Sequence, residues 1–276
     1  MKTNILAPNQ IISFTLSMRD YRQLLTWKLA AKAGAFAVRD LVLPPTCLAC
    51  DNGVDKQGVV CANCWASVRF IEKPYCAVLG SPFSYDLGTG ALSAQAIANP
   101  PPFDRLRSAV LYDDVARRLV QGLKFSDRTD LAPWMANWMV RASDGLLEEE
   151  AIIVPVPLHR RRLFGRRFNQ SAELGRVIAK QVGQHYAPEF LSRVRPTKQQ
   201  VGLGRKERDK NVRGAFRVPK EQVVNIKGRH VVLIDDVYTT GATLEACSRA
   251  LRRGGAKQID CLTFARVAHG VAVNDL

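Results

Sequence analysis

The sequence lacks an uninterrupted apolar run of the about 18 residues that a membrane-spanning helix needs. The amino-terminal stretch Thr3–Met18 carries no charge, but Pro8 and the polar residues Asn9, Gln10 and Ser13 interrupt it. No small-residue cleavage site follows a clean apolar segment, so we expect no secretory signal. We therefore expect a cytoplasmic protein without membrane insertion.

Acidic residues are also scarce, with 25 Asp and Glu against 40 Lys and Arg and a formal net charge of +15. Much of the excess lies between Pro155 and Arg217, where 16 basic residues face 4 acidic ones. Such a segment favours a polyanionic ligand, either a diphosphate, a nucleic acid or both. A generally basic surface is the alternative. Aromatic residues for base stacking are few there, mainly Phe164, Phe168 and Tyr186, which weakens the nucleic-acid interpretation.

The stretch Val231–Thr243 carries the strongest functional pattern. Four apolar residues lead into Asp235 and Asp236, and a turn of threonines around Gly241 follows. Apolar residues then recur at helical spacing from Leu244 onward. The pattern predicts a buried parallel strand, a tight loop and a helix.

This arrangement suits a phosphorylated sugar. Gly241 permits a turn that a Cβ atom would hinder, and the amides and hydroxyls of the turn can surround a phosphate at a helix N-terminus. Asp235 and Asp236 beside the turn would repel a bare anion. A ribose phosphate, however, has hydroxyls that can donate hydrogen bonds to these carboxylates, and a magnesium ion can offset their charge. The alternative is a solvated Asp-Asp turn after a buried strand.

Four cysteines form two C-x-x-C pairs, separated by ten residues that include Asp51-Asn52-Gly53. Two such pairs can close a tetrahedron of thiolates around one zinc ion, so the predicted ligands are Cys47, Cys50, Cys61 and Cys64. Redox-active thiols are the alternative, but no βαβ pattern surrounds either pair. A closed site of this kind leaves no position for a substrate, so its zinc would be structural.

The motif IDDVYTTGAT resembles the phosphoribosyl-diphosphate (PRPP) binding signature of type I phosphoribosyltransferases. More narrowly, the chain looks like the ComF (ComFC/GntX) family of bacterial competence-related proteins. Other segments similar to that family are Gly122–Phe125, Pro155–Pro157, Arg166–Gln170, Thr197–Leu203 and Arg208–Phe216.

The resemblance implies an α/β fold, namely a type I phosphoribosyltransferase-like parallel sheet with helices on both faces, plus a small N-terminal four-cysteine zinc-binding module. We divide the chain into a tail and helix (1–43, helical from Tyr21), the zinc module (44–86), a linker (87–102) and the phosphoribosyltransferase domain (103–276). The linker assignment follows from an uncharged stretch that ends in three prolines.

The resemblance also implies roles for individual residues. Asp235 and Asp236 would bind the ribose hydroxyls and stabilise developing positive charge. A magnesium ion held mainly by PRPP itself would accompany the diphosphate. The expected PRPP-binding residues are Tyr238, Thr239, Thr240, Gly241, Ala242 and Thr243 for the 5′-phosphate, and Arg166, Arg167 and Lys124 for the diphosphate. A flexible loop with Gln200, Arg208 and Asn211 would close over the ligand.

Two departures from the related patterns matter. Leu79 stands where ComF proteins often have the second cysteine of a further C-x-x-C-G-x-P segment, so a second metal site is not expected and Cys76 is expected in the core. Thr239 stands where hypoxanthine-type relatives have an aspartate base, so purine salvage is not supported.

Two functions remain open. The first is a phosphoribosyltransferase whose acceptor the sequence does not reveal. The second is a non-catalytic factor that binds PRPP or single-stranded DNA during DNA uptake, with a competence helicase as the expected protein partner.

Overall fold

A computed structural model describes residues 44–125, 128–148, 150–159, 168–195 and 205–268. The chain divides into two compact units, Met1–Pro45 and Thr46–Leu276, and the description below concerns the second. The helix predicted from Tyr21 to Leu43 lies outside the described residues. No helix in the described part is both long and apolar enough to cross a membrane.

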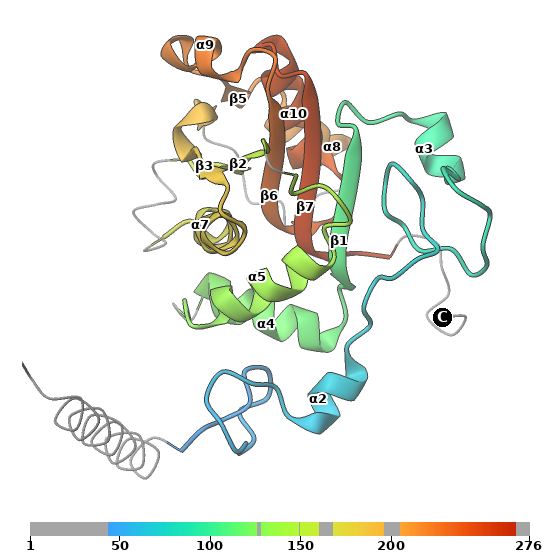
Figure 1. The fold of residues 1–276 in the computed structure, drawn as a ribbon, viewed down its shortest axis with the longest axis vertical. Coiled ribbons are helices and arrows are strands. Elements are labelled where there is room, and N and C mark those ends of the chain that lie inside the picture. Colours follow the sequence, from blue (N-terminus) through green and yellow to red (C-terminus); the bar gives the residue numbers. More distant parts are fainter. Residues whose placement is uncertain (1–43, 126–127, 149, 160–167, 196–204, 269–276) are drawn as a thin grey trace, which may run out of the picture. The chain divides into compact units, whose positions relative to one another are not determined.

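A five-stranded sheet of parallel strands forms the centre of this unit, in the order β1-β7-β6-β2-β3 (Figure 1). This confirms the predicted parallel sheet. The strands are β1 (Arg105–Leu111), β2 (Ile152–Pro155), β3 (His185–Tyr186), β6 (His230–Tyr238) and β7 (Gln258–Arg266).

The central strand β6 is longer than the sequence pattern predicts. The apolar run ends at Ile234, but the strand continues to Tyr238 because Val237 and Tyr238 pair with Ala265 and Arg266 of β7. The two carboxylates therefore lie within the strand and not in the turn after it.

The side chains of β6 alternate between two hydrophobic cores, as the period of a strand requires. Val232 and Ile234 belong to one core, and Val231 and Leu233 to the other. The first core includes residues of α4 (Asp114–Phe125), α5 (Leu131–Arg141) and α7 (Gln170–Val182), and the second includes α10 (Ala242–Arg253) and part of α8 (Arg205–Val212). Figure 1 shows these two groups of helices on opposite sides of the sheet, which confirms the predicted architecture.

Shorter elements complete the described part of the chain. Strands β4 and β5 form an antiparallel pair outside the main sheet. The short elements are α2 (Ala62–Ser67), α3 (Ala94–Ala98), α9 (Val223–Ile226), β4 (Ser192–Arg193), β5 (Phe216–Arg217) and the 3₁₀ helices η1 (Pro188–Phe190) and η2 (Lys220–Gln222).

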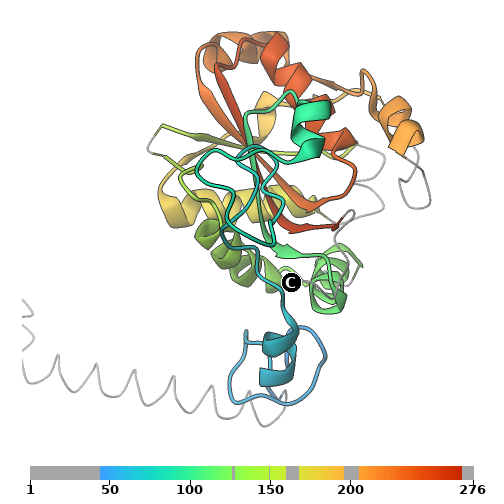
Figure 2. The ribbon, with the colours of Figure 1, turned by 90° about the vertical axis from the view of Figure 1, so that its right-hand side faces the viewer.

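The cysteine-containing segment packs directly on helix α5, beside the sheet. Cys47, Cys64 and Val68 are buried in the same core as α5, and Trp65 of α2 meets Trp138 edge-on with ring centroids 5.6 Å apart. Residues 70–80 then run along the edge strand β1 (Figures 1 and 2), where the N–H of Leu106 donates to the carbonyl of Val78.

Residues 87–102, predicted as a linker, contain helix α3. The side chain of Ser93 caps this helix by accepting the N–H of Ala96. Ala96 itself is buried in the same core as Leu106 of β1. The glycines and alanines that favour a linker are equally compatible with a tight turn and a short packed helix.

Candidate functional site

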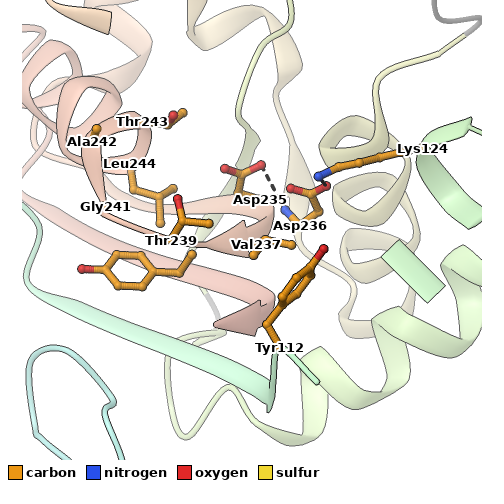
Figure 3. Close-up of a pocket in the computed structure, with 11 residues that line it drawn as sticks. Tyr112, Lys124, Asp235, Asp236, Val237, Thr239, Gly241, Ala242, Thr243 and Leu244 are labelled. Atoms are coloured by element: carbon orange, nitrogen blue, oxygen red, sulfur yellow. Dashed lines mark hydrogen bonds and ion pairs between the residues drawn. The ribbon is translucent and has the colours of Figure 1, made fainter. Parts of the chain in front are cut away.

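A pocket of about 270 Å³ lies at the carboxyl ends of β1 and β6, where a parallel sheet positions its ligands. It collects residues from β6, the following turn and the first turn of α10, together with the end of β1 and the end of α4 (Figure 3). The pocket is lined by Tyr112, Lys124, Asp235, Asp236, Val237, Tyr238, Thr239, Gly241, Ala242, Thr243 and Leu244.

The structure thus brings together most of the residues that the sequence singles out, including Lys124 with the acid pair and the turn. Thr240 lies within the same turn but is not part of the lining. Arg166, Arg167 and Gln200 lie outside the described residues.

Arg208 and Asn211, which are expected in a mobile segment that closes over the ligand, lie in a helix in the ligand-free protein. Both lie in helix α8, whose charged sequence Arg205–Lys210 consists mainly of good helix formers. The carbonyl of Asn211 accepts a hydrogen bond from the guanidinium of Arg195 at 3.1 Å.

The two carboxylates have different partners. Asp235 Oδ1 accepts the hydroxyl of Ser171 at 2.8 Å and the backbone N–H of Asp236 at 3.0 Å. Asp236 forms an ion pair with Lys124 at the end of α4, as Figure 3 shows. The positive charge of Lys124 therefore offsets part of the negative charge of the two carboxylates in the ligand-free protein.

The charges of this site shift the proton affinities of its groups. Burial, and then the charge of Asp236, raise the pKa of Asp235 to about 7, against the lowering effects of Ser171 and Lys124. Burial opposes the charge on Lys124, but the attraction of Asp236 outweighs it and leaves the pKa of Lys124 raised. Near neutral pH the site is therefore close to the point at which one carboxyl group takes up a proton.

The turn after β6 can hold an anion. Gly241 has a φ of 86° and precedes the first residue of α10, and a Cβ atom there would lie 2.9 Å from the hydroxyl oxygen of Tyr238. The first N–H groups of a helix have no partner within the helix and point toward this end. The hydroxyl oxygen of Thr240, in the same turn but outside the pocket lining, is buried and has no hydrogen-bond partner within the described ranges.

Asn169 fixes the strand-to-helix connection that carries Ser171. Its side-chain oxygen accepts the N–H of Ser171 at 3.2 Å as the cap of α7, and its side-chain nitrogen donates to the carbonyl of Val156 at 3.0 Å. Asn169 thus has a structural role beside the pocket.

Three residues of the site were not identified from the sequence. Tyr112 projects toward Val237 from the end of β1 (Figure 3), and the rule that ligands bind at strand carboxyl ends could have found it. Ser171 has no sequence signal of its own. Arg266, at the end of β7, is buried and its guanidinium lies 5.3 Å from the centre of the Tyr238 ring, while burial lowers its pKa.

The four predicted zinc ligands come together. Their sulfur atoms all lie within 4.8 Å of one another, and the sulfurs of Cys50 and Cys61 are 3.7 Å apart. A tetrahedron with zinc–sulfur bonds of about 2.3 Å has edges of about 3.8 Å, so the cluster has the size that zinc requires.

The environment of Cys47 also suits a metal thiolate. Burial opposes its ionisation, but the N–H groups of Cys61 and Ala49 point at its sulfur and outweigh burial, which lowers the pKa of Cys47 to about 6. Within the described residues this is the only cluster of three or more side chains arranged to bind a metal. These observations support a structural zinc ion and not a pair of redox thiols.

The parallel sheet, with an acid pair near the end of β6 and a glycine turn leading into α10, is the arrangement expected of a phosphoribosyltransferase domain. A family profile described as "Phosphoribosyl transferase domain" matches residues 177–275, and one described as "Double zinc ribbon domain" matches residues 38–96.

Similar proteins give the family. The chain is 34% identical to the "DNA utilization protein YhgH" of Salmonella typhimurium over 74% of this chain and 89% of that protein. It is 28% identical to "Competence protein F" of Haemophilus influenzae (80% of this chain, 96% of that one) and 24% identical to "Competence protein ComFC" of Bacillus subtilis (75% and 84%). The chain belongs to the ComF family and carries that family's phosphoribosyltransferase domain.

Proposed function

We propose that this protein binds PRPP with magnesium and transfers its phosphoribosyl group to an acceptor. The observation that carries the proposal is the shared pocket, in which the acid pair lies beside the helix-terminal turn. A ribose 5-phosphate presents vicinal hydroxyls and a phosphate at opposite ends, and the two parts of the pocket offer acceptors for the first and donors for the second.

The residues of the chain would act mainly by positioning. The turn from Tyr238 to Thr243 holds the 5′-phosphate, so binding energy from this remote group places the anomeric carbon. Asp235 and Asp236 accept the ribose hydroxyls and lie near the ring where positive charge develops. Binding of the sugar requires Asp236 to share or exchange its ion pair with Lys124.

Magnesium fits this site as a companion of the ligand. Its usual donors are one or two carboxylates, substrate phosphate oxygens and water, and Asp235 and Asp236 are the carboxylates that the pocket offers. When bound, the ion would neutralise charge on the diphosphate.

In the transfer itself, the bond between the anomeric carbon and the diphosphate oxygen breaks, and its electron pair leaves with the diphosphate. An electron pair of the acceptor forms the new bond, and the acceptor proton is released to water. The transition state resembles an oxocarbenium ion, as in other glycosyl transfers. Thr239 cannot accept the acceptor proton at neutral pH.

Calorimetric titration with PRPP and magnesium tests the proposal. We expect Asp235→Asn combined with Asp236→Asn to abolish measurable binding without unfolding the protein. Asp114→Asn is the matched control, because Asp114 is an exposed acid of α4 whose side chain is 74% exposed. Unchanged affinity in the double variant would rule out the acid pair as the ribose site, and release of diphosphate with a defined acceptor would establish catalysis.

Single-stranded DNA is a second candidate ligand. The relatives are named for DNA utilization and competence, and this chain has a formal net charge of +15. A DNA-binding role, alone or together with a competence helicase, predicts an affinity that falls steeply with salt. Affinity independent of salt between 50 and 200 mM would count against it.

A further inference from the structure

The matched profile describes a double zinc ribbon, yet the described residues contain a single four-cysteine cluster. Residues 75–98 nevertheless repeat the backbone contacts of the four-cysteine segment, residues 46–67. The two segments are called the second and the first ribbon below. In the first ribbon the N–H of Cys47 donates to the carbonyl of Asn52 at 2.7 Å, and in the second the N–H of Cys76 donates to the carbonyl of Ser81 at 2.8 Å. Both bonds span five residues, so they define the same turn.

Further backbone contacts repeat at matching positions. The residue before each of these cysteines forms an isolated antiparallel bridge seven residues on, Thr46 with Gly53 and Tyr75 with Pro82. The residue four positions after each cysteine has a positive φ, 60° at Asp51 and 59° at Gly80.

The second half of each ribbon also corresponds. The N–H of Leu48 donates to Val59, two residues before Cys61, and the N–H of Ala77 donates to Ala91, two residues before Ser93. Cys61 and Ser93 are the cap positions of α2 and α3.

The cap residues even approach the first cysteine of each ribbon in the same way. The N–H of Cys61 lies 3.2 Å from the sulfur of Cys47, and the N–H of Ser93 lies 3.2 Å from the sulfur of Cys76. The repeat therefore assigns the four ligand positions of the second ribbon to Cys76, Leu79, Ser93 and Ala96.

These four side chains do not fit a zinc ion. Leu79 and Ala96 have no donor atom, and the hydroxyl of Ser93 already caps α3. Cys76, Leu79 and Ala96 are instead 0%, 2% and 5% exposed within the core that also contains Leu106 of β1.

We propose that residues 75–98 are a metal-free copy of the zinc ribbon, in which a small apolar core replaces the metal. The copy is held by the sheet, since the N–H of Leu106 donates to the carbonyl of Val78 at 2.7 Å. It also supports the pocket, because the carbonyl of Leu79 accepts the buried guanidinium of Arg266 that stacks on Tyr238. The first ribbon binds zinc for its stability, and the second relies on packing against β1.

Zinc content tests this proposal in the full chain. We expect one zinc per chain in the wild type after dialysis against a chelator of moderate strength. Cys64→Ala should lose that zinc, whereas the matched variant Cys76→Ala should keep it. Two zinc ions in the wild type, or loss of zinc in folded Cys76→Ala, would overturn the proposal.

A reconstruction tests the structural correspondence itself. The triple substitution Leu79→Cys, Ser93→Cys and Ala96→Cys gives the second ribbon four cysteines, so we expect two zinc ions per chain and twice the thiolate-to-metal absorbance after cobalt substitution. A folded triple variant that holds only one metal ion would show that the two backbones are not equivalent. If the triple variant does not fold, the zinc content of the wild type and of Cys76→Ala decides.

Discussion

Asp235 shows how a single side chain can prepare a site for its ligand. The carboxyl group accepts the hydroxyl of Ser171 and lies next to a second carboxylate, and burial with this neighbouring charge raises its pKa to about 7. An ionised carboxylate accepts the hydroxyl of a sugar more strongly than a neutral carboxyl group does. Under the proposed function, ligand binding and loss of a proton at Asp235 are therefore linked.

This linkage predicts a dependence of stability on pH. The folded-state pKa of Asp235, about 7, lies above the ordinary value of 3.8, so its stabilising contribution is complete below about pH 4 and is lost as the pH rises through 7. Asp235→Asn removes this loss. Between pH 5.5 and pH 8 we expect the wild type to lose about 1–2 kcal/mol of unfolding free energy that the variant keeps. This figure is reduced because the side chain of Asp235 is partly exposed.

Urea unfolding of the ligand-free protein at the two pH values measures this effect. Asp114→Asn, which changes an exposed acid, should show the pH dependence of the wild type. If Asp235→Asn does the same, the carboxyl group is ionised throughout this range. In wild type, PRPP affinity should rise between pH 6 and pH 8.

At the scale of helices and strands, the sequence predicts the elements whose pattern lies within their own residues. The apolar run Val231–Ile234, the glycine of the turn and the helical spacing from Leu244 identify β6 and α10. The end of β6 was missed because Val237 and Tyr238 are held by pairing with β7, which is a long-range interaction. Helix α3 was missed because its five residues are stabilised by a serine cap and by burial of Ala96, and composition alone does not reveal either.

The same reasoning explains what could be predicted of the site. The acid pair and its turn are contiguous in sequence, so their motif was sufficient. Tyr112, Ser171 and Arg266 reach the pocket or its support from three other elements, and only the fold brings them there.

The turn at Gly80 gives a test at the scale of an element. Gly80 has a φ of 59°, and a Cβ atom there would lie 2.4 Å from the carbonyl oxygen of Leu106. Gly80→Ala therefore has to separate the second ribbon from β1, and we expect a loss of about 2–4 kcal/mol in unfolding free energy.

Gly58→Ala is the matched control for this turn. Gly58 also has a positive φ, 78°, but no atom lies within 4 Å of the added Cβ, so we expect only the backbone strain of about 1–2 kcal/mol. Chemical denaturation compares the two variants. Equal losses would mean that the ribbon is not held against β1 by this close approach.

At the scale of the molecule, the zinc ribbon and the parallel sheet share one core. Cys47, Cys64 and Val68 are buried with residues of α5, and Trp65 and Phe70 surround Trp138 with ring centroids 5.6 Å and 4.6 Å from it. Arg128 adds a hydrogen bond to the carbonyl of Leu48 at 3.3 Å. The sequence places the cysteines in a module of their own, whereas the structure makes them part of the packing around α5.

This shared core predicts that zinc stabilises more than its own ribbon. Removing zinc with a chelator frees Cys47 and Cys64 from a common ligand, so the side chains packed on α5 lose their fixed positions. We expect the main thermal transition to fall by several degrees, with a change in tryptophan emission as Trp65 and Trp138 separate. Cys64→Ala should reproduce the shift and Cys76→Ala should still respond to the chelator. A main transition that is insensitive to zinc would instead mean that the ribbon unfolds alone and that the contacts of Trp138 contribute little to the sheet.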